Sequence, residues 1–263
     1  MKSEKEKEQE RVDFVAGTAA KRIAQLEQDV SRWREQVMDI RRHFWEDVTV
    51  NIDNLDELTE TYASIKQQAE VLAEREHVHR HSLNQLKMLR RLKDSPYFGR
   101  IDFRENGSAR SERVYIGITS LLDDNEEDFL VYDWRAPISS MYYDYATGPA
   151  SYKTPMGTIS GTIDLKRQFI IQDGQIRTMF DTGITIGDEL LQEVLGKSSD
   201  AQMRSIVSTI QKEQNQIIRN EEKRLLIVQG SAGSGKTSAA LQRVAYLLYK
   251  HRSTLNAEQI VLF

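Results

Sequence analysis

The residues best suited to chemistry form a glycine-rich loop at positions 230–237. The segment GSAGSGKT fits the G-x-x-x-x-G-K-[ST] pattern in full and consists of Gly230, Ser231, Ala232, Gly233, Ser234, Gly235, Lys236 and Thr237. Such glycines let backbone N–H groups turn toward a phosphate chain, and the next helix adds partial positive charge. In this pattern the lysine reaches the β- and γ-phosphates and the threonine hydroxyl helps to hold Mg²⁺. We therefore predict a nucleoside triphosphate and Mg²⁺ site; the alternative is a strand-to-helix turn without a ligand.

The segments on both sides of this loop have the pattern that a phosphate-binding loop requires. The apolar run Leu225–Val228 predicts a strand before it, and TSAALQRVAYLLY predicts a helix that continues to about Tyr249. A second strand is expected to begin at Gln259. Because a buried parallel strand normally leads into further α/β units, we expect this chain to be part of a longer protein.

A glutamine lies sixteen residues before the loop, in the segment IQKEQNQII. The amide of Gln214 could pair with N6 and N7 of adenine, because it offers one donor and one acceptor in one plane. Taken alone, Gln214 also fits an exposed helix position. The sequence, however, resembles the superfamily 1 helicases, in which a glutamine at this place reads adenine. The resemblance implies that Gln214 binds the base and that the nucleotide is ATP rather than GTP.

Two other groups of residues are weaker candidates for chemistry. His77, His79 and His81 are two residues apart, so on a helix they point in different directions and should not share a metal ion. Trp134 and Arg135, in YDWRAP, are interpreted as part of a packed β-turn rather than as a catalytic pair. The sequence assigns no catalytic residue.

The first 95 residues predict two long helices that pair with each other. One apolar series, spaced mostly three and four apart, is Val12, Val15, Ala19, Ile23, Leu26, Val30, Trp33, Val37, Ile40 and Phe44. A second series is Leu55, Leu58, Tyr62, Ile65, Ala69, Leu72, Leu83 and Leu86. The segment VTVNIDNLDE between them suits a turn. We predict an antiparallel coiled-coil hairpin over residues 1–95.

The composition changes after Ser95, because most of the Gly, Pro and Tyr residues of the chain lie beyond this position. The turn signals ENG at 105–107 and DG at 173–174 indicate a small, mainly antiparallel β domain over residues 96–185. Residues 186–263 are predicted to hold linker helices, at Asp188–Leu195 and Ala201–Arg219, and the start of a RecA-like P-loop α/β motor domain. The fold class is therefore α+β multidomain.

Composition excludes several classes of protein. The chain has 263 residues with 36 basic and 40 acidic side chains, so it has no general positive surplus for gripping nucleic acid. It has no cysteine, which excludes disulfides and Cys-ligated zinc. The start MKSEKEKEQE is not a signal peptide, and the apolar runs are shorter than a membrane span. We expect a cytoplasmic protein with no membrane partner.

Four segments together resemble the HelD family of bacterial RNA polymerase-associated, helicase-like factors. These segments are VYDWRAPISSMYYDY, GTIDLKRQ, EQNQIIR and GSAGSGKT, and the resemblance extends over essentially the whole chain. It implies an arm in the secondary channel of the RNA polymerase core and a motor that contacts DNA or RNA. ATP hydrolysis would accompany displacement of nucleic acid and recycling of stalled polymerase. The later acidic and arginine-bearing motifs would lie beyond Phe263, so this chain alone is not expected to hydrolyse ATP.

The turn between the two predicted helices is acidic. Residues 43–65 contain no Lys or Arg, and their carboxylates are Glu46, Asp47, Asp53, Asp56, Glu57 and Glu60. One interpretation is an exposed turn whose acids stabilise a helix N-terminus. The other, within the HelD resemblance, is that Asp53, Asp56, Glu57 and Glu60 approach the catalytic Mg²⁺ of the polymerase. Asp56 and Glu57 are the first candidates.

Two other functions remain open at this point. One is a DNA-unwinding repair helicase whose coiled coil binds a partner, and the other is a nucleotide-regulated, non-motor protein that binds a channel. The predicted hairpin and β domain argue against a plain helicase, since translocation on DNA needs neither. The lack of a basic surplus agrees, because each phosphate contact normally needs its own Lys or Arg.

Overall fold

The computed structural model describes residues 2–48, 50, 55–181, 212–221, 225–231 and 234–261. Its contacts divide the chain into two compact units. One unit is Glu10–Ser95, and the other combines Met1–Gln9 with Pro96–Phe263. The boundary expected near residue 185 lies outside the described residues.

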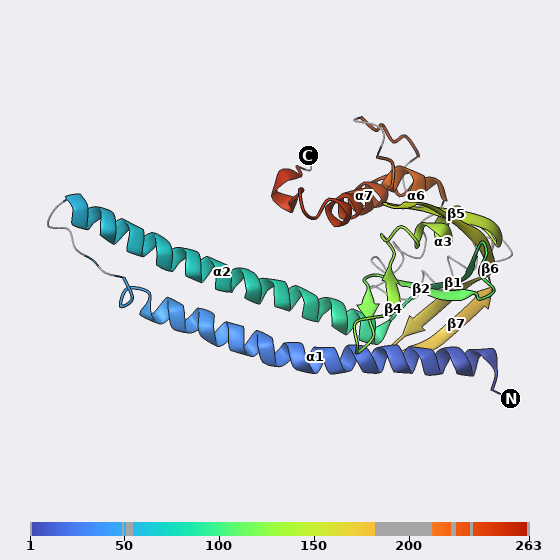
Figure 1. Ribbon diagram of the computed structural model, residues 1–263, viewed down its shortest axis with the longest axis horizontal. Coiled ribbons are helices and arrows are strands. Elements are labelled where there is room, and N and C mark those ends of the chain that lie inside the picture. The colour runs from blue at the N-terminus through green and yellow to red at the C-terminus, as the bar shows by residue number, and fades with distance from the viewer. Residues whose placement is uncertain are drawn as a thin grey trace. The chain divides into compact units, whose positions relative to one another are not determined.

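The Glu10–Ser95 unit consists of two long helices. Helix α1 (Glu4–His43) and helix α2 (Leu55–Asp94) have 40 residues each and run antiparallel, side by side (Figure 1). Arg41 Nη2 lies 2.6 Å from Glu76 Oε1, and Arg90 Nη2 lies 2.7 Å from Glu27 Oε1. Both exposed pairs fit one antiparallel register, although pairs of this kind contribute little stability. The two long helices are confirmed; the interlocking packing of a coiled coil stays a prediction.

The inner face of α1 agrees with the predicted apolar series, whereas the start of α2 does not. From Ile23 to Phe44 the predicted α1 positions are all buried or half-buried. In α2, Leu58 and Tyr62 were expected to face inward but are 50% and 70% exposed, and Ala69 is also exposed. The inward stripe there is Thr61, Ile65, Gln68 and Leu72. The difference is one of facing: Thr61, next to Tyr62, is only 6% exposed, so a neighbouring face of α2 points inward at this level.

In the described residues, the second unit is built on a seven-stranded sheet. Its strands are β1 (Gly99–Glu105), β2 (Glu112–Gly117), β3 (Leu121–Leu122), β4 (Phe129–Asp133), β5 (Gly148–Thr154), β6 (Gly157–Gln172) and β7 (Gln175–Asp181). The order is β3-β4-β2-β1-β6-β5, and β7 also pairs with β6. All pairs are antiparallel except β2–β4. The mainly antiparallel β domain is therefore confirmed for the described residues.

Both predicted turns lie where the sequence indicated them. Asp173 and Gly174 join β6 to β7 with φ of 53° and 69°, the two positive values that a tight type I′ hairpin turn requires. At the other turn, Gly107 has φ of 88° and the Ser108 N–H donates to the Glu105 carbonyl at 3.0 Å. The positive φ values at Asp173, Gly174 and Gly107 explain why Asp-Gly and Asn-Gly occur at these two turns.

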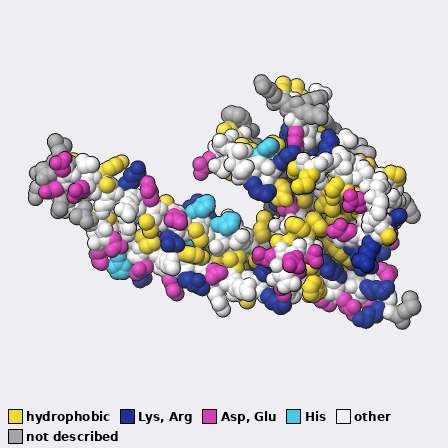
Figure 2. All heavy atoms as spheres, viewed as in Figure 1, with side chains coloured by type: hydrophobic (Ala, Val, Ile, Leu, Met, Phe, Trp, Pro, Cys, Tyr) yellow, Lys and Arg dark blue, Asp and Glu magenta, His cyan; other side chains and the backbone are white. Residues whose placement is uncertain are grey.

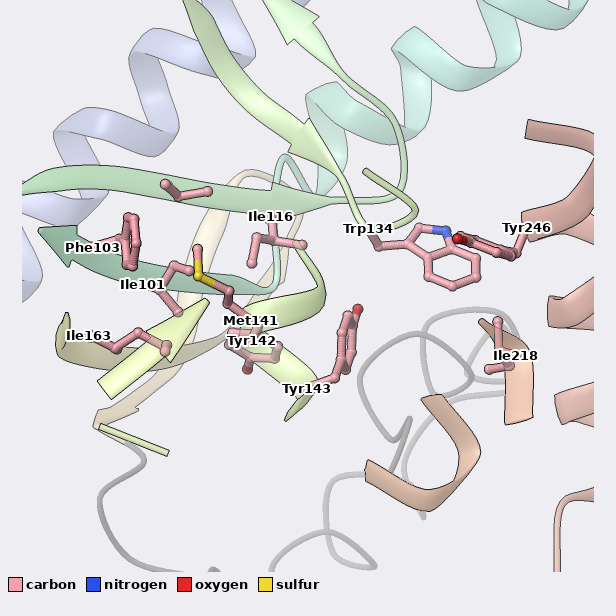
Figure 3. Close-up of a cluster of buried hydrophobic side chains, with 12 residues drawn as sticks. Ile101, Phe103, Ile116, Trp134, Met141, Tyr142, Tyr143, Ile163, Ile218 and Tyr246 are labelled. Carbon is pink, nitrogen blue, oxygen red and sulfur yellow. The ribbon is translucent and has the colours of Figure 1, made fainter. Parts of the chain in front are cut away.

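The described part of this unit also contains three helices and one short turn, namely α3 (Ser140–Asp144), α6 (Lys212–Ile218), α7 (Lys236–Lys250) and the 3₁₀ turn η1 (Ala257–Gln259). One apolar cluster joins the sheet to these helices (Figure 3). Its labelled members are Ile101, Phe103, Ile116, Trp134, Met141, Tyr142, Tyr143, Ile163, Ile218 and Tyr246. Because Ile218 belongs to α6 and Tyr246 to α7, these two helices share the core of the β domain.

One predicted strand is wrong, and the described residues of another, Gln259–Val261, are not in a strand either. Leu225–Val228 forms no strand, and Leu225 and Ile227 are 75% and 76% exposed. A β-strand needs a neighbour for its backbone hydrogen bonds, and no described strand pairs with this segment. Likewise, Gln259 ends η1, and the extended residue Ile260 after it is not in a strand. The helix after the loop is confirmed and ends at Lys250, while the predicted helix at Asp188–Leu195 lies outside the described residues.

No helix in the described ranges combines the length and the apolar character that crossing a membrane requires.

The charged first turns of α1 carry a buried carboxylate. Glu8 is 3% exposed, and it accepts hydrogen bonds from Arg100, from Arg167 Nη1 at 3.2 Å and from the Tyr115 hydroxyl at 3.2 Å. Burial opposes the charge on Arg100, but its hydrogen bond and attraction to Asp102 outweigh burial and raise the pKa of Arg100. These ionic contacts fix the first residues of α1 to β1 and β6.

Replacing this carboxylate should destabilise the β-domain unit. Glu8→Gln removes the negative charge that Arg100 and Arg167 share. Asp102 and Asp181 still balance part of their charge, but breaking a buried ion pair costs about 3–5 kcal/mol. We expect the free energy of unfolding to fall by about 3 kcal/mol in urea denaturation followed by tyrosine and tryptophan fluorescence. Glu27→Gln is the matched control, because it breaks an exposed pair on the same helix and should cost less than about 1 kcal/mol. Equal losses in both variants would contradict this account.

Candidate nucleotide-binding site

Helix α7 begins directly at the glycine-rich loop. Gly235 precedes it with φ of 80° and ψ of 15°, a left-handed conformation that favours glycine. A Cβ at this position would also lie 2.9 Å from Nε2 of Gln214. Glycine is therefore required here for the backbone conformation and for the close approach of Gln214.

The lysine of the motif lies inside the loop. Its Nζ donates to the carbonyls of Gly230 at 2.7 Å and Ser231 at 2.6 Å, and it lies 3.4 Å from Oγ of Ser234. A Cβ at Gly230 would come within 2.6 Å of that same hydroxyl, so a larger residue there would displace the Ser234 side chain. The ammonium group of Lys236 thus stands at the N-terminus of a 15-residue helix, where two sources of positive charge converge.

This arrangement fits a triphosphate. Thr237 occupies the first turn of α7 and is exposed, as a hydroxyl ligand to Mg²⁺ must be. The described part of the loop has no carboxylate that would repel phosphate. Ala232 and Gly233, the other two predicted loop residues, lie outside the described residues.

The structure brings Gln214 to the loop. Its Nε2 lies 3.5 Å from the Ser234 carbonyl, although the two residues are 20 positions apart in the sequence. Helix α6, which carries Gln214, packs against α7 and α3. One end of α7 therefore brings together Gln214, Gly230, Ser231, Ser234, Gly235, Lys236 and Thr237.

Sequence reasoning missed the residues that hold α6 in place. Asn215 is 1% exposed, and its Nδ2 donates to Oδ1 of Asp144 at 2.7 Å. Arg219 donates to Asn215 and to three carbonyls of the β domain. From α7, Arg243 Nη1 donates to the Ile217 carbonyl at 2.8 Å, which caps the end of α6. The available signal was the four-residue spacing of Asn215 and Arg219, which puts both on one helix face.

Helix α7 also contacts Glu221, three residues after the end of α6. Tyr246 donates to Glu221 at 2.8 Å, and Lys250 forms an ion pair with the same carboxylate. Burial and the hydrogen bond to Glu221 raise the pKa of Tyr246 to about 12. Burial opposes ionisation of Glu221, but the bonds from Lys250 and Tyr246 outweigh it and lower the pKa of this carboxyl. The contact is thus a charged one at neutral pH.

The YDWRAP segment is a packed turn, in agreement with its interpretation from sequence. The Asp133 carboxylate is buried and accepts from Arg135 Nε at 2.8 Å and Nη2 at 2.6 Å. The Ser139 hydroxyl donates to the Asp133 carbonyl at 2.7 Å, and Trp134 is buried in the cluster of Figure 3. The Arg135 guanidinium lies 4.6 Å from the ring centroid of Tyr249, on α7. The turn therefore contacts the P-loop helix directly.

The acidic candidates lie in the other unit, at the end of the helix pair. Asp56 and Glu60 are exposed and Glu57 is half-buried, while Asp53 lies outside the described residues. Glu46 is exposed, and Asp47 accepts from Gln68 Nε2 at 3.1 Å. Figure 2 shows acidic side chains over this end of α1 and α2. Within the described residues, no group of three or more His, Asp or Glu side chains is arranged to hold a metal ion.

Two matches to known protein families show to which class of protein this chain belongs. Residues 210–263 match the UvrD/REP helicase N-terminal domain, so Gln214 and the P-loop lie in a helicase-type motor segment. Residues 5–201 match the N-terminal domain of DNA helicase IV HelD. Because this second match covers well over half of the chain, the chain belongs to the HelD family. No curated protein matches it.

Proposed function

We propose that this chain binds ATP and Mg²⁺ within an ATP-dependent, helicase-like factor that acts on RNA polymerase. In this proposal α1 and α2 form a coiled-coil arm that enters the secondary channel of the polymerase core. The complete motor displaces DNA or RNA and recycles stalled polymerase. The protein then acts in the cytoplasm, with residues 1–95, 96–185 and 186–263 as arm, β domain and start of the motor. Membership of the HelD family and the geometry of the P-loop support it.

The nucleotide-binding part rests on the residues around the start of α7. The backbone N–H groups of the loop and the Lys236 ammonium bind the β- and γ-phosphates, and the Thr237 hydroxyl binds Mg²⁺. Bound Mg²⁺ supplies neutralisation of charge on the phosphate oxygens. Gln214 approaches the loop from α6 and recognises the adenine edge through its amide.

One observation carries the polymerase-binding part: the helix pair is long, and the segment 43–65 that joins its helices is acidic. A helix of 40 residues is about 60 Å long, which suits a deep and narrow channel. The segment 43–65 has no positive charge, so it is poorly suited to gripping nucleic acid and well suited to a cation-containing site. Trp45 and Tyr62 are exposed there and offer apolar contact area.

Competition on purified RNA polymerase core tests this function. We expect the chain to form a complex in size-exclusion chromatography, and a transcript-cleavage factor, which also uses the secondary channel, to displace it. Lys236→Ala is the control, because it alters the nucleotide site and should leave polymerase binding unchanged. Complex formation without displacement would contradict the channel assignment. Failure to bind polymerase, together with tight binding to duplex DNA, would favour a repair helicase.

A further inference from the structure

The orientation of Gln214 needs an external support. Helix α6 has only seven residues, and isolated helices of this length are not stable in water. An adenine-binding amide must nevertheless present its donor and acceptor in the plane of the base. The contacts that hold α6 therefore decide whether Gln214 can read the base.

Helix α7 supplies part of that support, and a turn of the β domain supplies another part. Arg219 Nη2 donates to the Trp134 carbonyl at 2.6 Å, and Nη1 lies 3.2 Å from the Arg135 carbonyl and 3.4 Å from the Ala136 carbonyl. One planar guanidinium thus contacts three successive carbonyls of one turn. Its carbon also lies 5.1 Å from the ring centroid of Tyr246, whose ring lies near Trp134 in Figure 3. Lysine, a single point donor, cannot reproduce this fork.

A second contact connects the same arginine to the residue beside Gln214. Arg219 Nε donates to Asn215 Oδ1 at 3.0 Å, and Asn215 Nδ2 donates to Asp144 Oδ1 at 2.7 Å. The Asn215 amide is thereby fixed at both ends, because its acceptor and one donor are engaged. Gln214, the next residue in the chain, points to the loop instead, where its Nε2 lies 3.5 Å from the Ser234 carbonyl.

We propose that Arg219, acting through Asn215, is a positioning residue for Gln214, and that the Trp134–Ala136 turn of the β domain is thereby part of the selectivity of the nucleotide site for adenine. The proposal rests on the proposed binding of ATP. It gives the YDWRAP turn a role in nucleotide recognition without any contact between that turn and the nucleotide. A purely structural role for Arg219 would instead affect all nucleotides alike.

Titrations of the chain with MgATP, MgGTP and Mg-tripolyphosphate separate the two roles. Arg219→Gln should weaken ATP binding about tenfold, which corresponds to about 1.4 kcal/mol, and should change tripolyphosphate binding less than about twofold. The ATP-to-GTP preference should fall by the same factor. Arg110→Gln, at an exposed arginine between β1 and β2, is the matched control and should change none of these affinities.

A double-mutant cycle with Gln214→Ala completes the test. If Arg219 acts through Gln214, the double variant should bind ATP no more weakly than Gln214→Ala alone. Additive losses, or equal losses of ATP and tripolyphosphate affinity, would overturn the proposal. If Arg219→Gln fails to fold, Asp144→Ala tests the same chain of contacts from α3 and should show the same selective loss. If the wild-type chain binds tripolyphosphate but does not prefer ATP to GTP, this inference is overturned and the P-loop assignment stays intact. If the wild-type chain binds neither tripolyphosphate nor a nucleotide, the proposed nucleotide site itself is overturned.

Discussion

Lys236→Ala is expected to weaken binding of MgATP about a hundredfold. The Lys236 ammonium lies within hydrogen-bond distance of two loop carbonyls, at the position where a β- or γ-phosphate oxygen would replace them as partners. Hydrogen bonds between charged groups contribute about 1.5–3 kcal/mol, and the upper part of that range corresponds to a hundredfold change in affinity. Titration with a fluorescent ATP analogue, read by anisotropy, measures the loss.

A matched lysine separates this effect from a general loss of charge. Lys153 is exposed on β5, so Lys153→Ala removes the same charge without altering the loop. Its ATP affinity should equal that of the wild type. Both variants should keep the wild-type melting temperature, because neither side chain is part of the core cluster. An affinity of Lys236→Ala within threefold of the wild type would show that the loop does not bind triphosphate as assigned.

Local patterns predicted the parts of the site that depend on neighbouring residues. The eight-residue loop motif predicts the turn that leads into a helix at Lys236, and the helix after it is amphipathic enough to be recognised alone. The Asp173–Gly174 turn is equally local, since two consecutive positive φ values select these residue types. Each of these features is determined within about ten residues.

Contacts between distant segments were not predictable in the same way. Glu8 stands in a run of charged residues that is typical of a solvated helix end, yet it is buried against Arg100 and Arg167. These partners lie 92 and 159 positions away along the chain. Arg219 is a similar case, because its partners are backbone carbonyls, which no side-chain pattern encodes. Only the folded arrangement distinguishes such groups from exposed charges.

The segment 225–228 shows the opposite error. Its apolar residues have the pattern of a buried strand, but strand formation depends on the hydrogen-bonding neighbours that the sheet supplies. The described sheet pairs all its strands among residues 99–181, and none lies beside this segment. Similarly, Leu58 and Tyr62 fit an apolar series in the sequence, whereas the face of α2 that points inward carries the polar residue Thr61 instead.

Removing the negative charges from the acidic turn of the helix pair should strongly slow the release of nucleic acid and should affect folding little. We expect the combined variant Asp53→Asn, Asp56→Asn, Glu57→Gln and Glu60→Gln to release nucleic acid from stalled polymerase about thirtyfold more slowly than the wild type. Four charges that each contribute about 0.5 kcal/mol near a water-exposed cation or phosphate account for this factor. Asn and Gln keep the side-chain shape, so the variant removes charge without removing bulk.

Binding and stability measurements exclude indirect causes. Polymerase affinity should remain within about threefold, since the length of the arm and the β domain would supply most of the contact area. Helix stability should fall by no more than about 1 kcal/mol, the usual contribution of acids near a helix N-terminus. The assay follows a labelled transcript leaving a stalled complex with the intact protein and ATP.

A second four-amide variant shows whether the position of the charges matters. Glu35, Asp39, Glu70 and Glu74 are exposed carboxylates along the two helices, away from residues 46–60. Converting these four to amides changes the net charge by the same amount, so a non-specific electrostatic effect would slow release equally in both variants. If release depends on carboxylates that approach the polymerase Mg²⁺, only the variant of the turn should be slow. Wild-type release by the turn variant, with unchanged affinity, would mean that these acids only solvate the turn and stabilise the start of α2.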